Sequence, residues 1–109
     1  MVSVNSVVLG GNLTRDPELK YLPNGTAVCD LNIAVNKKWT DKGTGEKKES
    51  VAFVGVVAFA RTAEMAAQHL KKGAPVLIEG ELTQDRWEDK TSGQKREKTK
   101  VTAQRVHFL

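Results

Sequence analysis

Two apolar stretches joined by a lysine-rich segment, between positions 28 and 59, constrain the fold more than any other part of the sequence. From Ala27 to Asn36 apolar and polar residues alternate, which is typical of a β-strand with one buried face. Residues 49–60 contain a second apolar run rich in β-branched side chains. The segment between them turns at Lys42-Gly43-Thr44-Gly45, so the stretch predicts a long β-hairpin with a basic loop.

Three further strands are predicted from the rest of the chain, over residues 3–13, 76–87 and 98–108. Gly10-Gly11 and Gly80 lie inside two of them and predict bends or bulges, because glycine leaves a gap in the packed face of a strand. In the last strand the apolar residues change parity near Gln104-Arg105, which predicts a second bulge.

One helix is predicted between residues 62 and 73. Its apolar face is formed by residues spaced i, i+3, i+4 and i+7, namely Ala63, Ala66, Ala67 and Leu70. Thr62 is expected to be the N-cap, and Gly73 is expected to adopt the left-handed conformation after the last turn. Pro75 then prevents the helix from continuing.

The order of these elements is three strands, a helix and two strands. A mostly β chain with its one helix between strands three and four matches the five-stranded Greek-key barrel called the OB-fold. At 109 residues the chain is expected to form one domain over residues 1–109. Residues 18–22 are expected to be a short extended piece between the first two strands.

The single cysteine, Cys29, lies on the apolar face of a strand and has no partner for an intrachain disulfide. No signal peptide and no apolar run of about 20 residues is present, which predicts a soluble, cytoplasmic protein. No metal cluster and none of the common catalytic motifs is found, so neither a cofactor nor an enzymatic activity is expected.

Positive charge is concentrated in two predicted loops. Residues 36–50 carry five basic and three acidic side chains, and residues 86–100 carry six basic and three acidic ones. These two excesses together exceed the net charge of +4 for the whole chain, so the remainder is slightly acidic. Such a concentrated positive field predicts a polyanionic partner.

Both tryptophans, Trp39 and Trp87, lie where a strand enters one of these basic loops. Phe53 and Phe59 share one parity on the strand after the first loop. Aromatic rings among lysines and arginines are typical of proteins that bind single-stranded nucleic acid, because rings stack on unpaired bases and cations meet phosphates. Taken singly, each ring could instead anchor the barrel, and each charged loop could simply be solvated.

Several ordered motifs resemble those of the bacterial single-stranded DNA-binding protein family, over nearly the full length. They are Val4-Asn5, Gly11-Asn12-Leu13, Asp16-Pro17-Glu18, Pro23-Asn24-Gly25, Trp39-Thr40-Asp41-Lys42, Thr44-Gly45-Glu46, Val56-Val57-Ala58-Phe59, Leu70-Lys71-Lys72-Gly73, Ile78-Glu79-Gly80-Glu81-Leu82 and Trp87. The resemblance implies an OB-fold that binds single-stranded DNA without sequence preference in replication, recombination and repair. It also implies a homotetramer in which strand one pairs across a subunit contact.

The resemblance places the base-stacking rings at Trp39, Phe53, Phe59 and Trp87. Phosphate contacts are implied by the resemblance at five positions that remain basic, which are Lys20, Lys42, Lys48, Arg61 and Lys72. The basic loops add six further candidates, which are Lys37, Lys38, Lys47, Arg86, Lys95 and Arg96. Ser6, Gly55 and Asp85 occupy places that are often basic in the family.

The family continues into a disordered tail with an acidic end that recruits replication and repair proteins, whereas this sequence ends at Leu109. We expect a truncated form rather than a natural tailless one, and expect such partners only if a tail exists beyond Leu109. Three alternatives stay open at this point. They are a primosome-type or RNA-binding OB-fold protein, a non-catalytic protein–protein interaction module, and a small nuclease, which the missing carboxylate–metal cluster argues against.

Overall fold

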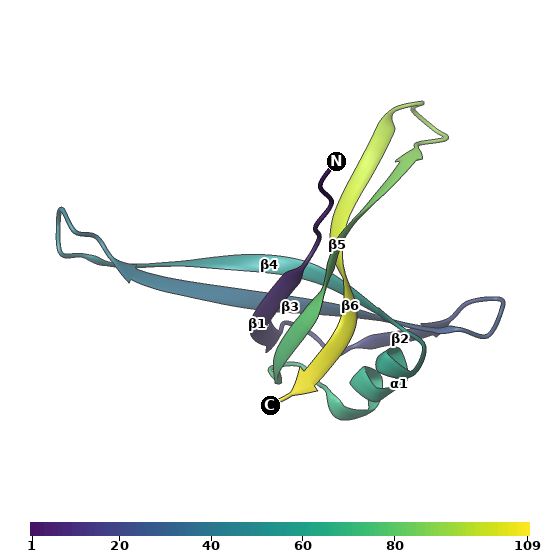
Figure 1. Ribbon diagram of the computed structural model, residues 1–109, viewed down its shortest axis with the longest axis horizontal. Helices are drawn as coiled ribbons and strands as arrows, with labels where there is room; N and C mark the ends of the chain where they lie inside the picture. Colours follow the sequence, from purple (N-terminus) through teal and green to yellow (C-terminus); the bar gives the residue numbers. More distant parts are fainter.

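The computed structural model describes residues 1–109 as six strands and one helix (Figure 1). The elements are β1 (Val7–Leu13), β2 (Glu18–Tyr21), β3 (Ala27–Thr40), β4 (Lys47–Phe59), α1 (Ala60–His69), β5 (Pro75–Glu88) and β6 (Lys95–Phe108). Five long strands correspond to the five predicted from the sequence. The short extended piece at residues 18–22 forms β2, which pairs with the edge of β3.

The five long strands close into a barrel in the order β1-β5-β6-β4-β3. Closure comes from β1, which pairs with β5 over most of its length and then with β3 at Asn12 and Leu13. Strands β4 and β6 pair in parallel at Val56 and Val101, while all other neighbours are antiparallel. This topology confirms the predicted OB-fold.

The two glycine positions in the strands serve different purposes. At Gly80 the ladder between β5 and β6 shifts register, and Gln104 is the extra residue on the opposite strand. The sequence therefore predicted both sides of one bulge correctly. At Gly11 the ladder with β5 continues without a shift, but a side chain would collide with the carbonyl of Ala34. Glycine there allows β1 to pass close to β3 where the barrel closes.

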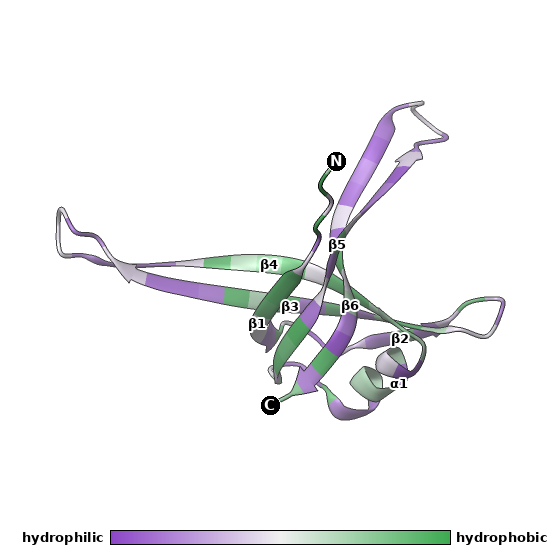
Figure 2. Cartoon of the chain, viewed as in Figure 1, coloured by the Kyte–Doolittle hydropathy of each residue, from purple (hydrophilic) through white to green (hydrophobic).

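Alternate residues of β3 form the centre of the core, as the alternating pattern predicted. Ala27, Cys29, Leu31 and Ile33 are buried together with apolar residues of the other strands and of α1. The helix contacts β3, β4 and β6 and covers one end of the barrel. Its small inward residues, Ala63 and Ala66, are fully buried, which lets the helix lie close to the strands. In Figure 2 much of β1, β4 and the lower part of β5 is green, whereas the strands of the two projecting hairpins are mostly purple.

The predicted N-cap of the helix was wrong, and the predicted left-handed Gly73 is confirmed but lies beyond the C-cap. The helix begins at Ala60, directly after β4, with Phe59 at the N-cap position and no side-chain cap. Thr62 therefore lies within the first turn and cannot cap it. Ala60 has a positive φ of 55°, which turns the chain sharply from strand to helix. At the other end Leu70 is the C-cap, and Gly73, with φ of 88°, lies in the turn that leads into β5.

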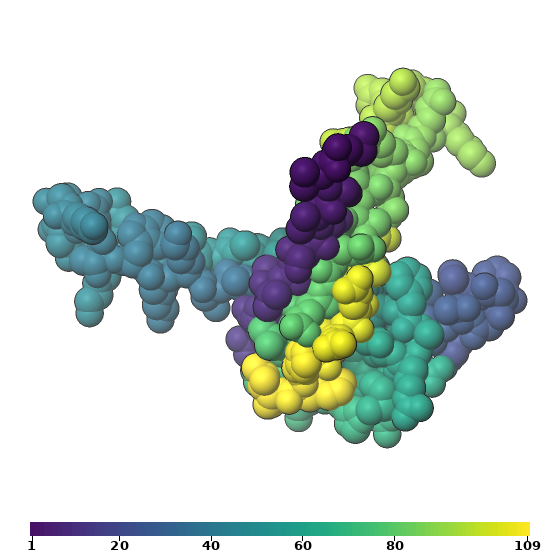
Figure 3. Space-filling view, viewed as in Figure 1, coloured from purple at the N-terminus to yellow at the C-terminus, as the bar shows by residue number.

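The first strand also begins later than predicted, at Val7 instead of residue 3. The side chain of Asn5 explains this difference, because it both accepts from the Leu82 N–H and donates to the Leu82 carbonyl, each at 2.7 Å. An amide side chain thus replaces the main chain as the partner of β5. The amino-terminal segment lies along β5 in the space-filling view (Figure 3).

Two hairpins project from the barrel in different directions (Figures 1 and 3). We call residues 36–51 the β3–β4 arm and residues 83–100 the β5–β6 arm. Because of them the radius of gyration is 16.7 Å, whereas about 13 Å is expected for a compact domain of this length. Both basic loops of the sequence are these arms, so most of the concentrated positive charge lies away from the barrel.

Candidate nucleic-acid interface

The ends of the two arms have the same sequence pattern, 48 positions apart. Residues 39–48 and residues 87–96 both read Trp-x-Asp-Lys-x-(Thr/Ser)-Gly-x-Lys-(Lys/Arg). The two basic loops with their tryptophans therefore form a repeat that composition alone does not reveal. The alignment predicts that both loops turn in the same way.

The hydrogen bonds of the two turns are equivalent. In the β3–β4 arm the Asp41 N–H donates to the Glu46 carbonyl, and the Gly45 N–H donates to the Asp41 carbonyl, both at 2.8 Å. The corresponding bonds at Asp89, Gln94 and Gly93 have the same lengths. Both aspartate side chains also accept a hydrogen bond from the N–H two residues later. Each turn thus holds its arm in a fixed hairpin.

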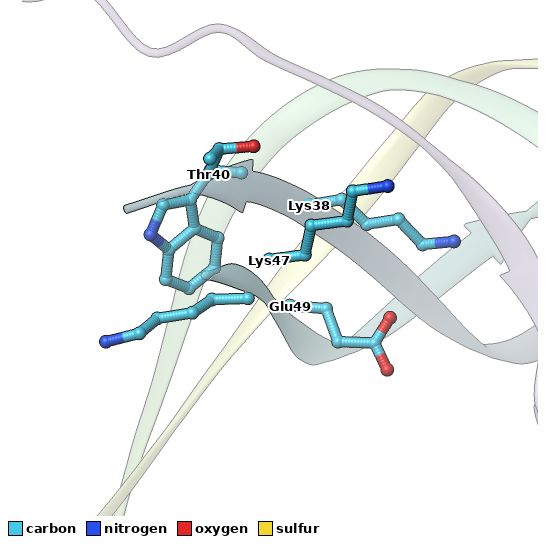
Figure 4. A pocket seen from close by; sticks show the side chains of 6 residues that line it. Lys38, Thr40, Lys47 and Glu49 are labelled. Atoms are coloured by element: carbon cyan, nitrogen blue, oxygen red, sulfur yellow. The ribbon is translucent and has the colours of Figure 1, made fainter. Parts of the chain in front are cut away.

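Each tryptophan lies across its arm from a basic residue. Trp39 is opposite Lys48 in the ladder, and Trp87 is opposite Arg96. Both rings line surface hollows whose other walls are mostly charged side chains, as Figure 4 shows for the β3–β4 arm with Lys38, Lys47 and Glu49. The Lys37 ammonium group lies 5.8 Å from the centre of the Trp39 ring, at cation–π distance.

The two predicted phenylalanines lie on the outer surface of the barrel. Phe53 is opposite Ala34 and Phe59 is opposite Val28, and both partners belong to the outward-facing set of β3. Trp39, Phe53, Phe59 and Trp87 are 41%, 77%, 40% and 50% exposed. All four rings predicted to stack are therefore accessible to a ligand.

The four rings do not share one face. Phe53 and Phe59 are six residues apart on the outer face of β4, or about 20 Å in an extended strand. Trp39 belongs to the opposite face of the same ladder, because side chains alternate along a strand. Trp87 lies on the face of β5–β6 that continues along β6 toward the outer face of β4. The structure thus brings three rings to one connected surface and leaves Trp39 on the far side of its ladder.

The eleven predicted phosphate-binding side chains are all exposed, but they differ in their neighbours. Four of them form ion pairs, at 3.2–3.8 Å, with Glu18, Asp41, Glu97 or Asp89, and these are Lys20, Lys48, Arg86 and Arg96. Seven form none within 4.0 Å, and these are Lys37, Lys38, Lys42, Lys47, Arg61, Lys72 and Lys95. The second group is available to a polyanion without breaking an existing pair.

Two residues of the β3–β4 hairpin have shifted pKa values, one in its turn and one in the core. The Gly43 N–H, followed by the Lys48 ammonium, lowers the pKa of the Asp41 carboxyl, which keeps the turn-forming carboxylate ionised. Burial, followed by the negative charge of Asp30, raises the pKa of the Cys29 thiol. Cys29 is fully buried, so this thiol is protonated and packed in the core.

The comparison with known proteins agrees with this geometry. A family model described as "Single-strand binding protein family" matches residues 4–109. The chain belongs to the single-strand binding protein family. A curated protein of Wolinella succinogenes, named single-stranded DNA-binding protein, is 50% identical over 105 residues. The alignment covers 96% of this chain and 64% of that protein, so the chain spans about two thirds of the relative's length.

Solved structures of the single-strand binding family share the fold. A Thermus aquaticus single-stranded DNA binding protein, in a deletion mutant, matches with a TM-score of 0.85 and 35% identity, over 97% of this chain and 50% of that one. A Plasmodium falciparum protein, solved in complex with single-stranded DNA, matches with a TM-score of 0.89 and 25% identity, over 100% of this chain and 97% of that one.

Three basic residues beside the outer face are not among the eleven predicted phosphate contacts. Arg15, between β1 and β2, and Lys98 and Lys100, on β6, line one hollow together with Gly55. Arg15 lies in the segment Arg15-Asp16-Pro17, whose proline predicts a break between strands, so its local sequence does not indicate a binding role. No sequence signal links it to Gly55, since 40 positions separate them and only the β3–β4 register brings them together.

The described residues contain no group of three or more His, Cys, Asp or Glu side chains placed to hold a metal ion. The only helix is too short, and not apolar enough, to cross a bilayer.

Proposed function

We propose that this chain is a single domain that binds single-stranded DNA with little sequence preference. The observation that carries the proposal is the repeated arm, in which an accessible tryptophan lies opposite a basic residue at the same place in two hairpins. Membership of the single-strand binding protein family and the DNA complex of the Plasmodium falciparum relative support it.

In the proposed mechanism unpaired bases stack on Trp39, Trp87, Phe53 and Phe59. Each stacked base is worth about 1–3 kcal/mol, and every base has a π-face, so stacking accepts any sequence. Paired bases in a duplex hide these faces inside the helix. Double-stranded DNA is therefore expected to bind much more weakly than a single strand.

The exposed lysines and arginines of the arms contact phosphates in this mechanism. Each contact releases a condensed counterion, so the logarithm of the affinity falls with the logarithm of the salt concentration by about 0.7 per contact for a single strand. Lys37, Lys38, Lys42 and Lys47 are expected to dominate this term in the β3–β4 arm, because they are not engaged with carboxylates, whereas Lys48 is.

The proposal extends to self-assembly through β1. One edge of β1 pairs with β5, while its other edge pairs with β3 only at Asn12 and Leu13. Val8, in the free part of β1, is exposed, and so is Val4 in the amino-terminal segment. An unpaired strand edge with apolar side chains favours pairing with a second copy. We propose a homotetramer built on this contact, and a monomer mass in sedimentation equilibrium would exclude it.

We further propose that the chain acts on single strands exposed during DNA replication, recombination and repair, as a DNA-bound protein of the nucleoid without catalytic activity. Protection of such strands requires tight binding and no chemistry, which fits an interface made of rings and cations.

Titration of the intrinsic tryptophan fluorescence with oligo-dT tests the proposed function. Stacking on Trp39 or Trp87 is expected to quench the emission at low salt, and added salt is expected to reverse the quenching. Oligo-U and duplex DNA at the same concentrations are the matched controls, because they separate single-stranded DNA binding from RNA binding and from general polyanion binding. An excess of oligo-dT that leaves the emission unchanged would contradict the proposal.

A further inference from the structure

The outer face of β3 and β4 has a recess between its two phenylalanines. Four cross-strand pairs follow one another on this face, namely Val28–Phe59, Asp30–Val57, Asn32–Gly55 and Ala34–Phe53. The pair of Asn32 and Gly55 lies between Phe53 and the buried Val57. A Cβ atom added at Gly55 would meet nothing within 4 Å, so the space above this glycine is empty.

Arg15 reaches this recess from the connection between β1 and β2. The amide orientation that satisfies both groups turns the Asn32 oxygen toward the guanidinium, and Arg15 Nε and Nη2 then donate to it at 2.9 and 3.0 Å. Arg15, Asn32 and Gly55 line the same two hollows, one of which also contains Phe53. A guanidinium has five N–H donors, so three remain for a ligand.

The recess offers groups of both charges to a ligand. Its lining includes the carboxylates of Glu18 and Asp30 as well as the cations of Arg15, Lys98 and Lys100, so acceptors and donors are both present. The polar edge of a base offers both donors and acceptors to such walls, whereas a phosphate is expected beside Lys98, which forms no ion pair within 4.0 Å. The floor, formed by Gly55 and Val57, offers the flat apolar contact that a base needs.

Basic residues lead from the β5–β6 arm into the recess. On β6, Arg96, Lys98, Lys100 and Thr102 share one face because side chains alternate. Arg96 is opposite Trp87, and Thr102 pairs with Val57 on β4. A strand that stacks on Trp87 can therefore follow this face, with its phosphates near Lys98, down to Gly55.

We propose that the Gly55 recess is a base-binding subsite of this chain, in which an unpaired base lies between Phe53 and Phe59 and Arg15 and Asn32 contact its polar edge. Lys98 neutralises a neighbouring phosphate. The inference rests on the proposed single-stranded DNA binding and deepens it, because it names a subsite that none of the four rings provides.

Gly55→Val tests the recess. Valine favours the strand conformation and the position is open, so the variant is expected to keep the fold and the thermal stability. Its side chain fills the recess, and oligo-dT binding is expected to weaken about tenfold, within the range for the loss of one base contact. Ala52→Val, three residues away on the other face of β4, is the matched control and is expected to bind like the wild type.

The variants Arg15→Ala and Lys98→Ala distinguish a contact with a base from a contact with a phosphate. Arg15→Ala is expected to lower the affinity for oligo-dT severalfold and to leave the salt slope unchanged, while Lys98→Ala is expected to reduce the slope by about 0.7. A reduced slope for Arg15→Ala would show a phosphate site and overturn the proposal. Wild-type affinity in folded Gly55→Val would overturn it too. Failure of the wild type to bind oligo-dT would instead contradict the proposed function itself.

Discussion

The two arms have the same turn geometry but differ in the share of their basic side chains that is free of ion pairs. In the β3–β4 arm four of the five basic residues form no ion pair, whereas in the β5–β6 arm three of the six are paired with carboxylates. The clearest difference lies two residues before each tryptophan. Lys37 occupies that place in the first arm and Asp85 in the second. Lys37 lies over the Trp39 ring, while Asp85 holds Lys100 at 2.7 Å.

This difference shows that a net charge counted from sequence does not measure the charge available to a ligand. Residues 86–100 have more basic side chains than residues 36–50, but half of their cations are already engaged. Exposed ion pairs contribute little to stability, so they are easily exchanged for phosphates, but the released carboxylate then repels the DNA. We therefore expect the β3–β4 arm to dominate the salt-dependent part of binding and both arms to share the stacking.

The largest expected effect comes from removing the tryptophans. Trp39→Ala and Trp87→Ala are each expected to cost about 1–3 kcal/mol in oligo-dT binding, because each removes one stacking surface. The arms are separate, so the double variant is expected to lose about the sum. Fluorescence anisotropy of a labelled oligonucleotide measures both. Unchanged binding in one single variant would break the equivalence of the arms, and unchanged binding in both would show that the rings only support the structure.

A smaller effect is expected from exchanging the charges that distinguish the arms. Lys37→Asp is expected to weaken binding and reduce the salt slope by about 0.7, because it removes one phosphate contact. Asp85→Lys is expected to have the opposite effect, since it adds a cation at the equivalent place and frees Lys100. The affinity measured at several salt concentrations gives both slopes. If both substitutions changed the salt slope in the same direction, the proposed difference in available charge between the two arms would be refuted.

Each turn is expected to be destabilised when one of its glycines is replaced. Gly45 and Gly93 both have φ of 71°, so Gly45→Ala and Gly93→Ala each force an alanine into the left-handed region, at about 1 kcal/mol. The expected result is faster amide hydrogen exchange at the end of the mutated arm, with the barrel unchanged. Gly43→Thr is the control, because Thr91 already occupies the matching place in the other turn. Equal exchange in Gly45→Ala and Gly43→Thr would contradict the shared turn geometry.

The smallest effect concerns pH. The pKa of Asp41 is lowered from its ordinary value of 3.8, chiefly by the Gly43 N–H. The ionised carboxylate therefore stabilises the turn fully above pH 3.8, and this contribution is lost as the pH falls through the lowered pKa. The chemical shift of the Gly43 amide is expected to report this titration at acidic pH. A midpoint at or above 3.8 would show that the hydrogen bond does not favour the charged form.

Most of the fold followed from local patterns in the sequence. The alternation from Ala27 to Asn36 predicted which residues of β3 are buried, and Gly80 with Gln104 predicted the bulge from its two sides. The helix start was wrong because propensity favoured a Thr62 cap, while the path of the chain out of β4 fixed the first turn at Ala60. The start of β1 was wrong because the Asn5 side chain replaces its main chain.

The candidate site was predicted in part. Trp39, Trp87 and the basic arms followed from composition and position in the sequence, and all four rings are exposed. The sequence did not predict which surface of the molecule each ring occupies, because that depends on strand register and on how the arm leaves the barrel. Arg15 could not be found for the same reason, since its proximity to Gly55 exists only once β3 pairs with β4.

Single-tryptophan variants test the central claim that both arms bind the same strand of DNA. Trp87→Phe leaves Trp39 as the only reporter of the β3–β4 arm, and Trp39→Phe leaves Trp87 for the β5–β6 arm. Titrated with oligo-dT at low salt, both are expected to be quenched over the same range of oligonucleotide concentration. Quenching of only one reporter, or quenching of the two at widely different concentrations, would contradict the account.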